Sequence, residues 1–176
     1  IEYPFYSSKM IYIPNPINFT EIKILSKKNE YDFFNDNFII SVARLDRQKD
    51  FPTLINAFAK IADSLNLKLL ILGEGPERKN IEQLINKLSL NEKIIMPGFV
   101  INPYYYIKKS NLFVLSSISE GMPNSLIHAI CLGKKVISTD CKFGTKEIIE
   151  GSRSGLLTSC GNINEMAKKI ENILSN

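Results

Sequence analysis

Apolar residues along the chain fall into short runs that alternate with longer amphipathic stretches. The runs predict strands at Phe38–Ala43, Lys68–Leu72, Lys93–Met96, Leu112–Leu115 and Lys135–Ser138. A further short extended piece is predicted at residues 156–157. The amphipathic stretches predict helices at residues 52–65, 77–90, 103–109, 123–132, 145–149 and 163–174. Strands separated by helices of this length imply right-handed crossovers. The pattern therefore predicts an α/β fold, with a doubly wound parallel sheet of about six strands flanked by helices.

The first 37 residues follow a different pattern. Residues 10–16 read as an extended segment broken by prolines, and residues 21–37 are charged with weak periodicity. We therefore predict that residues 1–37 form a linker or arm and that residues 38–176 form one folded domain. Because the chain begins with Ile1 rather than Met, we expect it to be part of a longer protein.

Composition limits the classes of protein and partner. Apolar residues make up 44% and charged residues 23%, which is ordinary for a globular domain. No apolar run reaches the length of a membrane span, and no segment resembles a signal peptide. The net charge of +4 comes without a dense basic stripe and interleaved aromatics, so we expect no nucleic-acid partner. Three cysteines without close pair spacing and one histidine argue against a zinc site and predict reduced thiols in a cytoplasmic protein.

The loop after the predicted strand Leu112–Leu115 opens a helix and carries the first candidate residues. Gly121 lets the backbone approach a ligand, and Pro123 suits the first helical turn, where its missing N–H would be unpaired anyway. The N–H groups from Met122 to Ser125 then point at one spot, and the helix dipole favours an anion there. The loop predicts a hole of phosphate size, although an ordinary helix with a solvated polar face gives the same pattern.

Polar side chains flank this predicted hole. Asn124 and His128 are four residues apart and share one helix face, and Glu120 stands just before the helix. A carboxylate, an amide and an imidazole around a phosphate-sized hole indicate a site for a sugar nucleotide.

A second loop supports this interpretation. The run Phe38–Ala43 is apolar throughout, as expected for a strand buried on both faces, and Arg44 follows at its carboxyl end. Lys49 lies just before the helix that Pro52 opens. Ligands of open α/β sheets bind outside the carboxyl ends of the strands, where a guanidinium and an ammonium suit a diphosphate. Taken alone the two cations read as surface charges; beside the Glu120 loop they favour a diphosphate site.

Five stretches now resemble a known family in both order and spacing. They are SVARLDRQKDFPTLINAF, LLILGEGPER, IIMPGFV, LFVLSSISEGMPNSLIHAICLGKKVISTD and SGLL, spread over residues 38–157. The chain resembles the C-terminal, donor-binding domain of a retaining family 4 (group 1) glycosyltransferase. Such enzymes have the two-domain GT-B architecture, so the resemblance implies a Rossmann-like domain that forms the C-terminal half of a GT-B fold.

The resemblance implies an activity and a role for each candidate. It implies retaining, metal-independent transfer of a hexose or N-acetylhexosamine from a nucleoside-diphosphate sugar, with UDP expected, to a polysaccharide or lipid-linked acceptor. Arg44 and Lys49 would hold the phosphates and Glu120 would orient the sugar, so these three are the catalytic candidates. The residues implied to contact the base are Gly98, Phe99 and Val100. The remaining implied donor-binding residues lie on the loop that contains Glu120 and on the helix that it opens: Gly121, Met122, Pro123, Asn124, Ser125 and His128.

His128 departs from the family pattern. The second Glu of the family's E-x7-E motif, which normally grips the ribose, would fall at this position. A neutral imidazole can accept one hydrogen bond and donate another, but it lacks the carboxylate's charge-assisted strength. Three interpretations stay open: a tolerated variation, adaptation to another nucleotide or sugar, or loss of donor binding. The alternatives to transfer are a degenerate, non-catalytic nucleotide- or sugar-binding module and a GT-B-shaped sugar-nucleotide epimerase.

The resemblance also implies partners and a location. The nucleotide-sugar donor is the co-substrate, and we expect no metal or other cofactor. A glycan or lipid-linked acceptor would bind through the N-terminal half, so this fragment should bind donor without turnover. We expect a bacterial, cytoplasmic enzyme of polysaccharide or cell-envelope synthesis. Peripheral association of the full-length enzyme with the inner face of the membrane is compatible with a lipid-linked acceptor.

Overall fold

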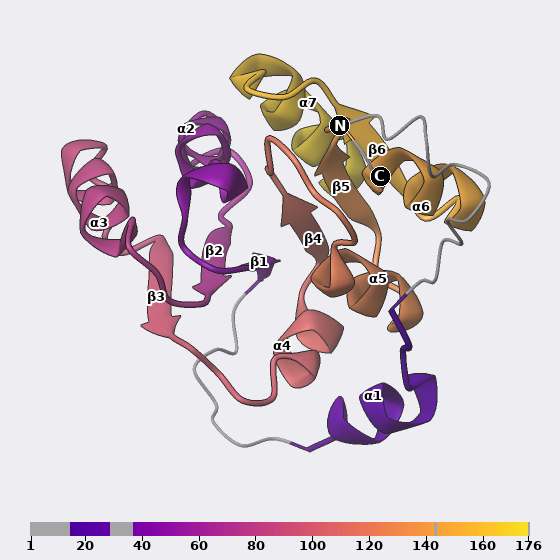
Figure 1. Cartoon of the computed structure of the whole chain (residues 1–176). Coiled ribbons are helices and arrows are strands. Elements are labelled where there is room, and N and C mark those ends of the chain that lie inside the picture. The colour runs from indigo at the N-terminus through magenta and orange to yellow at the C-terminus, as the bar shows by residue number, and fades with distance from the viewer. Residues whose placement is uncertain (1–14, 29–36, 143, 176) are drawn as a thin grey trace, which may run out of the picture.

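The computed structural model describes residues 15–28, 37–142 and 144–175. Within these ranges the strands are β1 Phe38–Val42, β2 Lys68–Leu72, β3 Ile94–Gly98, β4 Leu112–Leu115, β5 Val136–Thr139 and β6 Gly155–Thr158. The helices, labelled in Figure 1, are α1 Phe19–Leu25, α2 Phe51–Ala59, α3 Arg78–Lys87, α4 Tyr104–Lys109, α5 Asn124–Cys131, α6 Thr145–Ser152 and α7 Ile163–Leu174. A short 3-10 helix, η2 (Arg47–Lys49), precedes α2.

All six strands form one parallel sheet, in the order β3-β2-β1-β4-β5-β6. The predicted doubly wound parallel sheet is therefore confirmed. β1 pairs with β2 on one side and with β4 on the other, so the strand order reverses between β1 and β4. In open α/β sheets, the crevice at the carboxyl ends of two such strands is where ligands bind.

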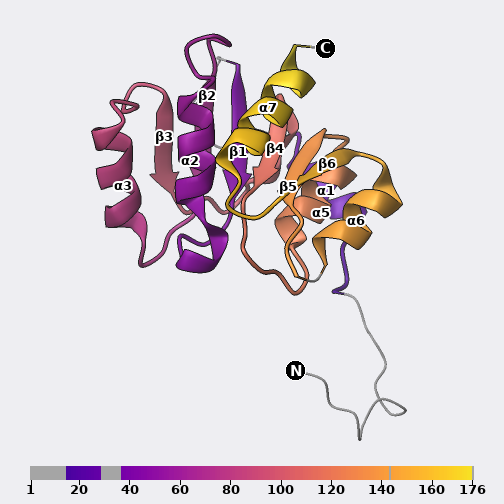
Figure 2. The same cartoon turned by 90° about the horizontal axis from the view of Figure 1, so that it is seen from above.

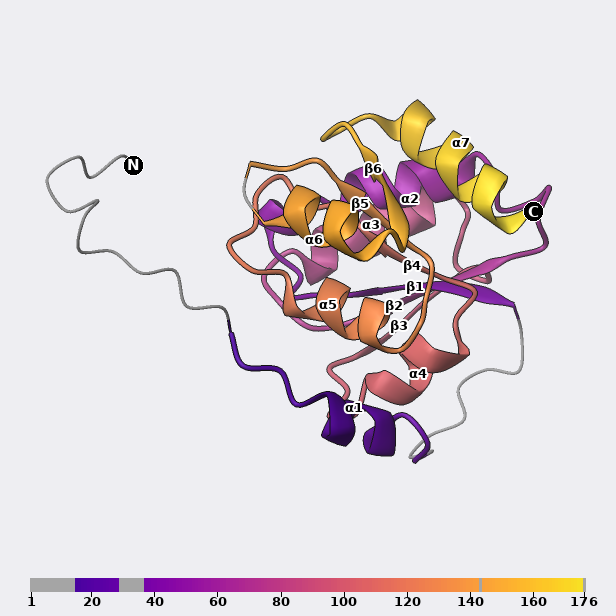
Figure 3. The ribbon, with the colours of Figure 1, turned by 90° about the vertical axis from the view of Figure 1, so that its right-hand side faces the viewer.

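Helices cover both faces of the sheet, as the edge-on view in Figure 3 and the view in Figure 2 show. One core packs α2, α3 and α7 against side chains such as Ile39 and Ile71. The other packs α1, α4, α5 and α6 against Phe38, Ile40 and Phe113. Neighbouring residues of β1 thus enter opposite cores, because side chains alternate across a strand. Both faces of the central strands are buried, which explains their continuous apolar runs.

Most predicted elements form, with shifts at their ends. α2 ends at Ala59 rather than near residue 65, because turn-forming residues follow: the Ser64 hydroxyl donates to the Ile61 carbonyl, and Asn66 has φ 43°. β3 contains Pro97, which a strand tolerates at the edge of a sheet.

The predicted arm also contains a helix that its weak periodicity does not indicate. α1 packs its Ile22 into the second core, and the Asn102 amide donates to the Leu25 carbonyl at 3.0 Å. Residues 1–14 and 29–36 of the arm lie outside the described residues. Among the helices that the structure describes, none has both the length and the apolar character needed to cross a bilayer.

Gly73 fixes how closely the ends of β1 and β2 approach. Its φ is +147°, and a Cβ at this position would lie 1.9 Å from the Ala43 carbonyl oxygen. We expect Gly73→Ala to lower the free energy of unfolding by about 2 kcal/mol or more, because the backbone would have to shift. Gly121→Ala is the matched control, since a Cβ at residue 121 would have nothing within 4 Å. Urea unfolding of both variants measures the difference, and equal stabilities would contradict the close packing at Gly73.

Candidate functional site

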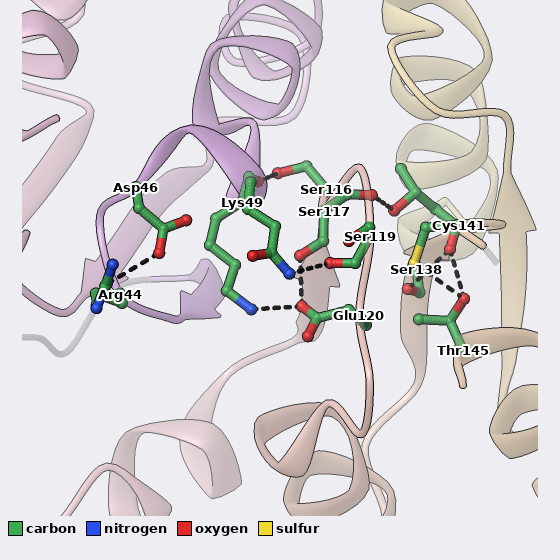
Figure 4. Close-up of polar contacts among 12 residues, drawn as sticks. Arg44, Asp46, Lys49, Ser116, Ser117, Ser119, Glu120, Ser138, Cys141 and Thr145 are labelled. Atoms are coloured by element: carbon green, nitrogen blue, oxygen red, sulfur yellow. Dashed lines mark hydrogen bonds and ion pairs between the residues drawn. The ribbon is translucent and has the colours of Figure 1, made fainter. Parts of the chain in front are cut away.

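A largely buried ion pair joins the loops that follow β1 and β4. Lys49 Nζ lies 2.6 Å from Glu120 Oε1, and the two side chains are only 19% and 6% exposed. The Ser117 hydroxyl donates to the same carboxylate oxygen at 2.6 Å. Figure 4 shows the Lys49 and Ser117 side chains meeting at this Glu120 oxygen. Burial of a carboxylate is costly unless a counter-charge and hydrogen bonds compensate it, and here both are present.

Hydrogen bonds hold the same two loops together along their backbones. The Ser116 hydroxyl donates to the Lys49 carbonyl at 2.7 Å. The Ile118 amide donates to the Gln48 carbonyl at 2.8 Å, and the Gln48 amide group donates to the Ser119 carbonyl at 2.6 Å. The cation and the carboxylate are therefore held in place by the loops around them and not only by their own attraction.

The loop after β5 supports the Glu120 loop from behind. The Thr139 hydroxyl donates to the Ser117 carbonyl, and the Thr145 hydroxyl donates to the Thr139 carbonyl at 2.9 Å. Gly144, with φ +81°, comes so close that a Cβ would lie 2.5 Å from the Gly121 carbonyl oxygen. The end of β5 and the start of α6 thus support the backbone of the Glu120 loop; Figure 4 labels Thr145 on this side of the site.

A pocket of about 580 Å³ opens at the carboxyl ends of β1, β2 and β3. Its walls come from the ends of these strands, the loop after β3, and α4 and α5: Val42, Ala43, Arg44, Leu72, Gly73, Glu74, Phe99, Val100, Ile101, Pro103, Tyr104 and His128. Arg44 Nε contacts Asp46 Oδ2 at 2.9 Å, yet the Arg44 side chain is 72% exposed. The guanidinium is therefore accessible to an anion at the mouth of the pocket.

His128 and Tyr104 form one wall of this pocket. Their rings meet edge to face, with centroids 5.2 Å apart. Burial lowers the pKa of His128 below its usual value, which favours the neutral imidazole. Burial also raises the pKa of Tyr104, with a smaller contribution from the charge of Glu21. The wall thus presents neutral groups able to donate and accept hydrogen bonds.

Tyr104 is a pocket-lining residue that the sequence does not single out, because a run of three tyrosines at 104–106 reads as helix packing. Tyr106 does pack into the core, being only 2% exposed. Residues two apart on a helix face nearly opposite directions, so Tyr104 faces the pocket instead. The tyrosine run can be seen in the sequence, but only the placement of α4 shows that Tyr104 lines the pocket and Tyr106 packs into the core.

The segment predicted to contact a base borders the pocket. Gly98 has φ +100°, and its carbonyl accepts from the Gly73 amide at 2.9 Å, which ties β3 to β2. Phe99 is 73% exposed, whereas Val100 is partly buried against the second core. Phe99 and Val100 line the pocket, and Gly98 precedes them as the last residue of β3.

The start of α5 keeps its backbone donors uncapped by side chains. Pro123 is the N-cap residue rather than the first helical residue, and its carbonyl accepts from the Leu126 and Ile127 amides. No side chain caps this end of the helix within the described residues. A Cβ at Gly121 would have nothing within 4 Å. This geometry leaves the first-turn N–H groups available to an anion.

Asn124 does not join His128 in the pocket. Its side-chain oxygen accepts from the Asn15 amide group at 3.1 Å, and the Asn15 backbone N–H contacts Met122 Sδ at 3.1 Å. The beginning of the described chain therefore lies against the predicted anion loop.

The candidates thus fall into neighbouring groups. Arg44, Phe99, Val100 and His128 line the pocket. Lys49 and Glu120 form the ion pair, and residues 121–125 form the turn that opens α5. Their roles toward a ligand stay predictions. In the part of the chain that the structure describes, no group of three or more His, Cys, Asp or Glu side chains could hold a metal ion.

Known proteins are similar to this chain in sequence. An uncharacterized glycosyltransferase of Methanocaldococcus jannaschii is 39% identical over 143 residues, which cover 78% of this chain and 35% of the relative. A second relative, from Campylobacter jejuni, is an N-acetylgalactosamine-N,N'-diacetylbacillosaminyl-diphospho-undecaprenol 4-alpha-N-acetylgalactosaminyltransferase. It is 39% identical over 139 residues, which cover 79% of this chain and 38% of the relative. The chain therefore spans a little over a third of the length of these relatives.

A solved structure matches the fold of this chain, and a family model matches its sequence. A mutant of S. aureus TarM, in complex with Fondaparinux, alpha-GlcNAc-glycerol and UDP, matches with a TM-score of 0.76 and 27% identity. The match covers 85% of this chain and 31% of TarM. The family described as "Glycosyl transferases group 1" matches residues 24–176. With most of its length matched and its sheet of the GT-B type, the chain belongs to the group 1 glycosyltransferases.

Proposed function

We propose that this chain is the donor-binding half of a glycosyltransferase that uses a UDP-linked hexose or N-acetylhexosamine. The acceptor class is a glycan or a lipid-linked saccharide. The name of the C. jejuni relative, which transfers N-acetylgalactosamine to a diphospho-undecaprenol saccharide, supports both the sugar and the acceptor class. UDP in the TarM complex supports the nucleotide. Retention of configuration and independence from metal are part of the same proposal and rest on the family.

The arrangement of Arg44, Lys49 and Glu120 at the strand-order reversal carries this proposal. Arg44 stands at the pocket mouth, and Lys49 stands in the adjoining loop beside Glu120. As the anomeric bond breaks, charge develops on the leaving diphosphate, and positioned cations and helix N–H groups stabilise it. Arg44 and Lys49 would bind that diphosphate together with the first turn of α5. Glu120 would then accept a hydrogen bond from a sugar hydroxyl.

The pocket beside Arg44 would take the nucleoside. Its volume of about 580 Å³ lies in the range of small-ligand sites. Phe99 and Val100 would lie against the base, and neutral His128 would share hydrogen bonds with the ribose hydroxyls. Such bonds are weaker than those of a carboxylate. The histidine at residue 128, in place of the family's glutamate, favours a second candidate function: a nucleotide- or sugar-binding module without catalytic activity.

Calorimetric titration with UDP, GDP and ADP in the presence of EDTA tests the donor site. We expect saturable binding of UDP, and Arg44→Ala should weaken it by about tenfold or more, because a charged hydrogen bond to phosphate is lost. Arg47→Ala is the matched control: Arg47 has the same charge, lies three residues away and is 91% exposed beside Glu77. Absence of UDP binding, or equal losses in both variants, would contradict the proposed site.

The single histidine of the chain makes the pocket wall accessible to a titration. Its lowered pKa means that the unfolded chain, with a histidine pKa of about 6.5, takes up the proton more readily. We therefore expect the free energy of unfolding to fall as pH drops below about 6.5, and His128→Gln to lose part of that dependence. NMR of the imidazole and urea unfolding at pH 7.5 and 5.5 measure both effects. An imidazole that titrates at or above the usual value would contradict a buried neutral His128.

A further inference from the structure

The two oxygens of the Glu120 carboxylate have different surroundings. Oε1 accepts from both Lys49 Nζ and the Ser117 hydroxyl, each at 2.6 Å. Among the described residues, no group donates to Oε2. A carboxylate oxygen has two lone-pair sites, so Oε1 is fully used and Oε2 remains as an acceptor. The protein therefore fixes one side of the carboxylate and leaves the other for a ligand.

The two donors to Oε1 are not equivalent once a donor substrate binds. Lys49 carries a charge and three N–H donors, so a diphosphate would compete with Glu120 for it. Ser117 is neutral, and its residue is 0% exposed, so a ligand has no access to its hydroxyl. Ser117 is thus the contact on Glu120 that an arriving diphosphate leaves unchanged.

Ser117 is itself firmly held. Its carbonyl accepts from the Thr139 hydroxyl on β5 and from Cys160 Sγ at 3.7 Å. The preceding residue, Ser116, donates to the Lys49 carbonyl. Two consecutive serines after β4 therefore hold the two partners of the ion pair, one by its backbone and the other by its carboxylate.

We propose that Ser117 is a positioning residue, which holds Glu120 by Oε1 so that Oε2 accepts a hydroxyl of the donor sugar. The inference rests on the proposed function and adds a residue that acts through Glu120 without touching the substrate. It explains why a fully buried serine hydroxyl donates to a carboxylate that already has a lysine partner.

The test compares the affinity of the chain for UDP with that for UDP-GlcNAc and UDP-GalNAc, in wild type and Ser117→Ala. The gain in affinity that the sugar adds over UDP should fall by about tenfold in the variant, because a hydrogen bond to a charged group is lost. Affinity for UDP itself should stay unchanged. Ser138→Ala is the matched control: Ser138 is equally buried but donates to the Thr139 carbonyl.

A double-mutant cycle separates positioning from a general effect on the fold. If Ser117 acts through Glu120, then Ser117→Ala should add no further loss in the Glu120→Gln background. Equal losses for UDP and UDP-sugar, or additive losses in the cycle, would overturn the positioning role of Ser117, while UDP binding by the wild type would leave the proposed function standing. Failure of the wild type to bind UDP would instead reject the proposed function.

A ligand-free crystal structure of Ser117→Ala tests the positioning by itself. The proposal requires the Glu120 carboxylate to turn or to occupy more than one rotamer once the fixed donor is gone. A carboxylate in its wild-type position, with Oε1 still on Lys49 alone, would overturn it whatever the nucleotide measurements show.

Discussion

The pairing of Lys49 with Glu120 is the interaction on which the geometry of this site depends. The two residues are 71 positions apart, and they meet only because β1 and β4 are neighbours in the sheet. Removing one partner of a buried ion pair typically costs about 3–5 kcal/mol, since the other charge is left uncompensated. The loops after β1 and β4 are thus held in one arrangement before any ligand arrives, and the loop after β5 reinforces it through Thr139 and Thr145. Such preorganisation is what stabilisation of a developing charge requires.

Much of the fold can be predicted from the sequence because the central strands are buried on both faces. A continuous apolar run such as Phe38–Val42 predicts a strand that is buried on both faces of the sheet. The helical stretches between such runs favour right-handed crossovers between parallel strands. α1 escaped prediction for the opposite reason. It is short and buries only Ile22, while Phe19 and Ile24 stay exposed, so its apolar residues do not mark one helix face. Its helix depends on packing against α4 and α5 and not on its own pattern.

The site shows the same division. Arg44, Lys49 and Glu120 could be named from the sequence because each follows a strand at the carboxyl edge of the sheet. The sequence could not show that Lys49 and Glu120 form an ion pair, because this contact depends on the path of two loops. Asn124 shows this limit, since its side chain contacts Asn15 from the predicted arm. Tyr104 shows it too, because the orientation of α4 alone decides that this ring meets His128 while Tyr106 enters the core.

A crystal structure of the chain with UDP bound would test whether this preorganised edge of the sheet is a donor site. The account predicts the diphosphate within hydrogen-bond reach of Arg44 and Lys49 near the first turn of α5, with the ribose beside His128 and the base against Phe99 and Val100. Nucleotide bound at another surface, or a diphosphate that contacts neither cation, would contradict it.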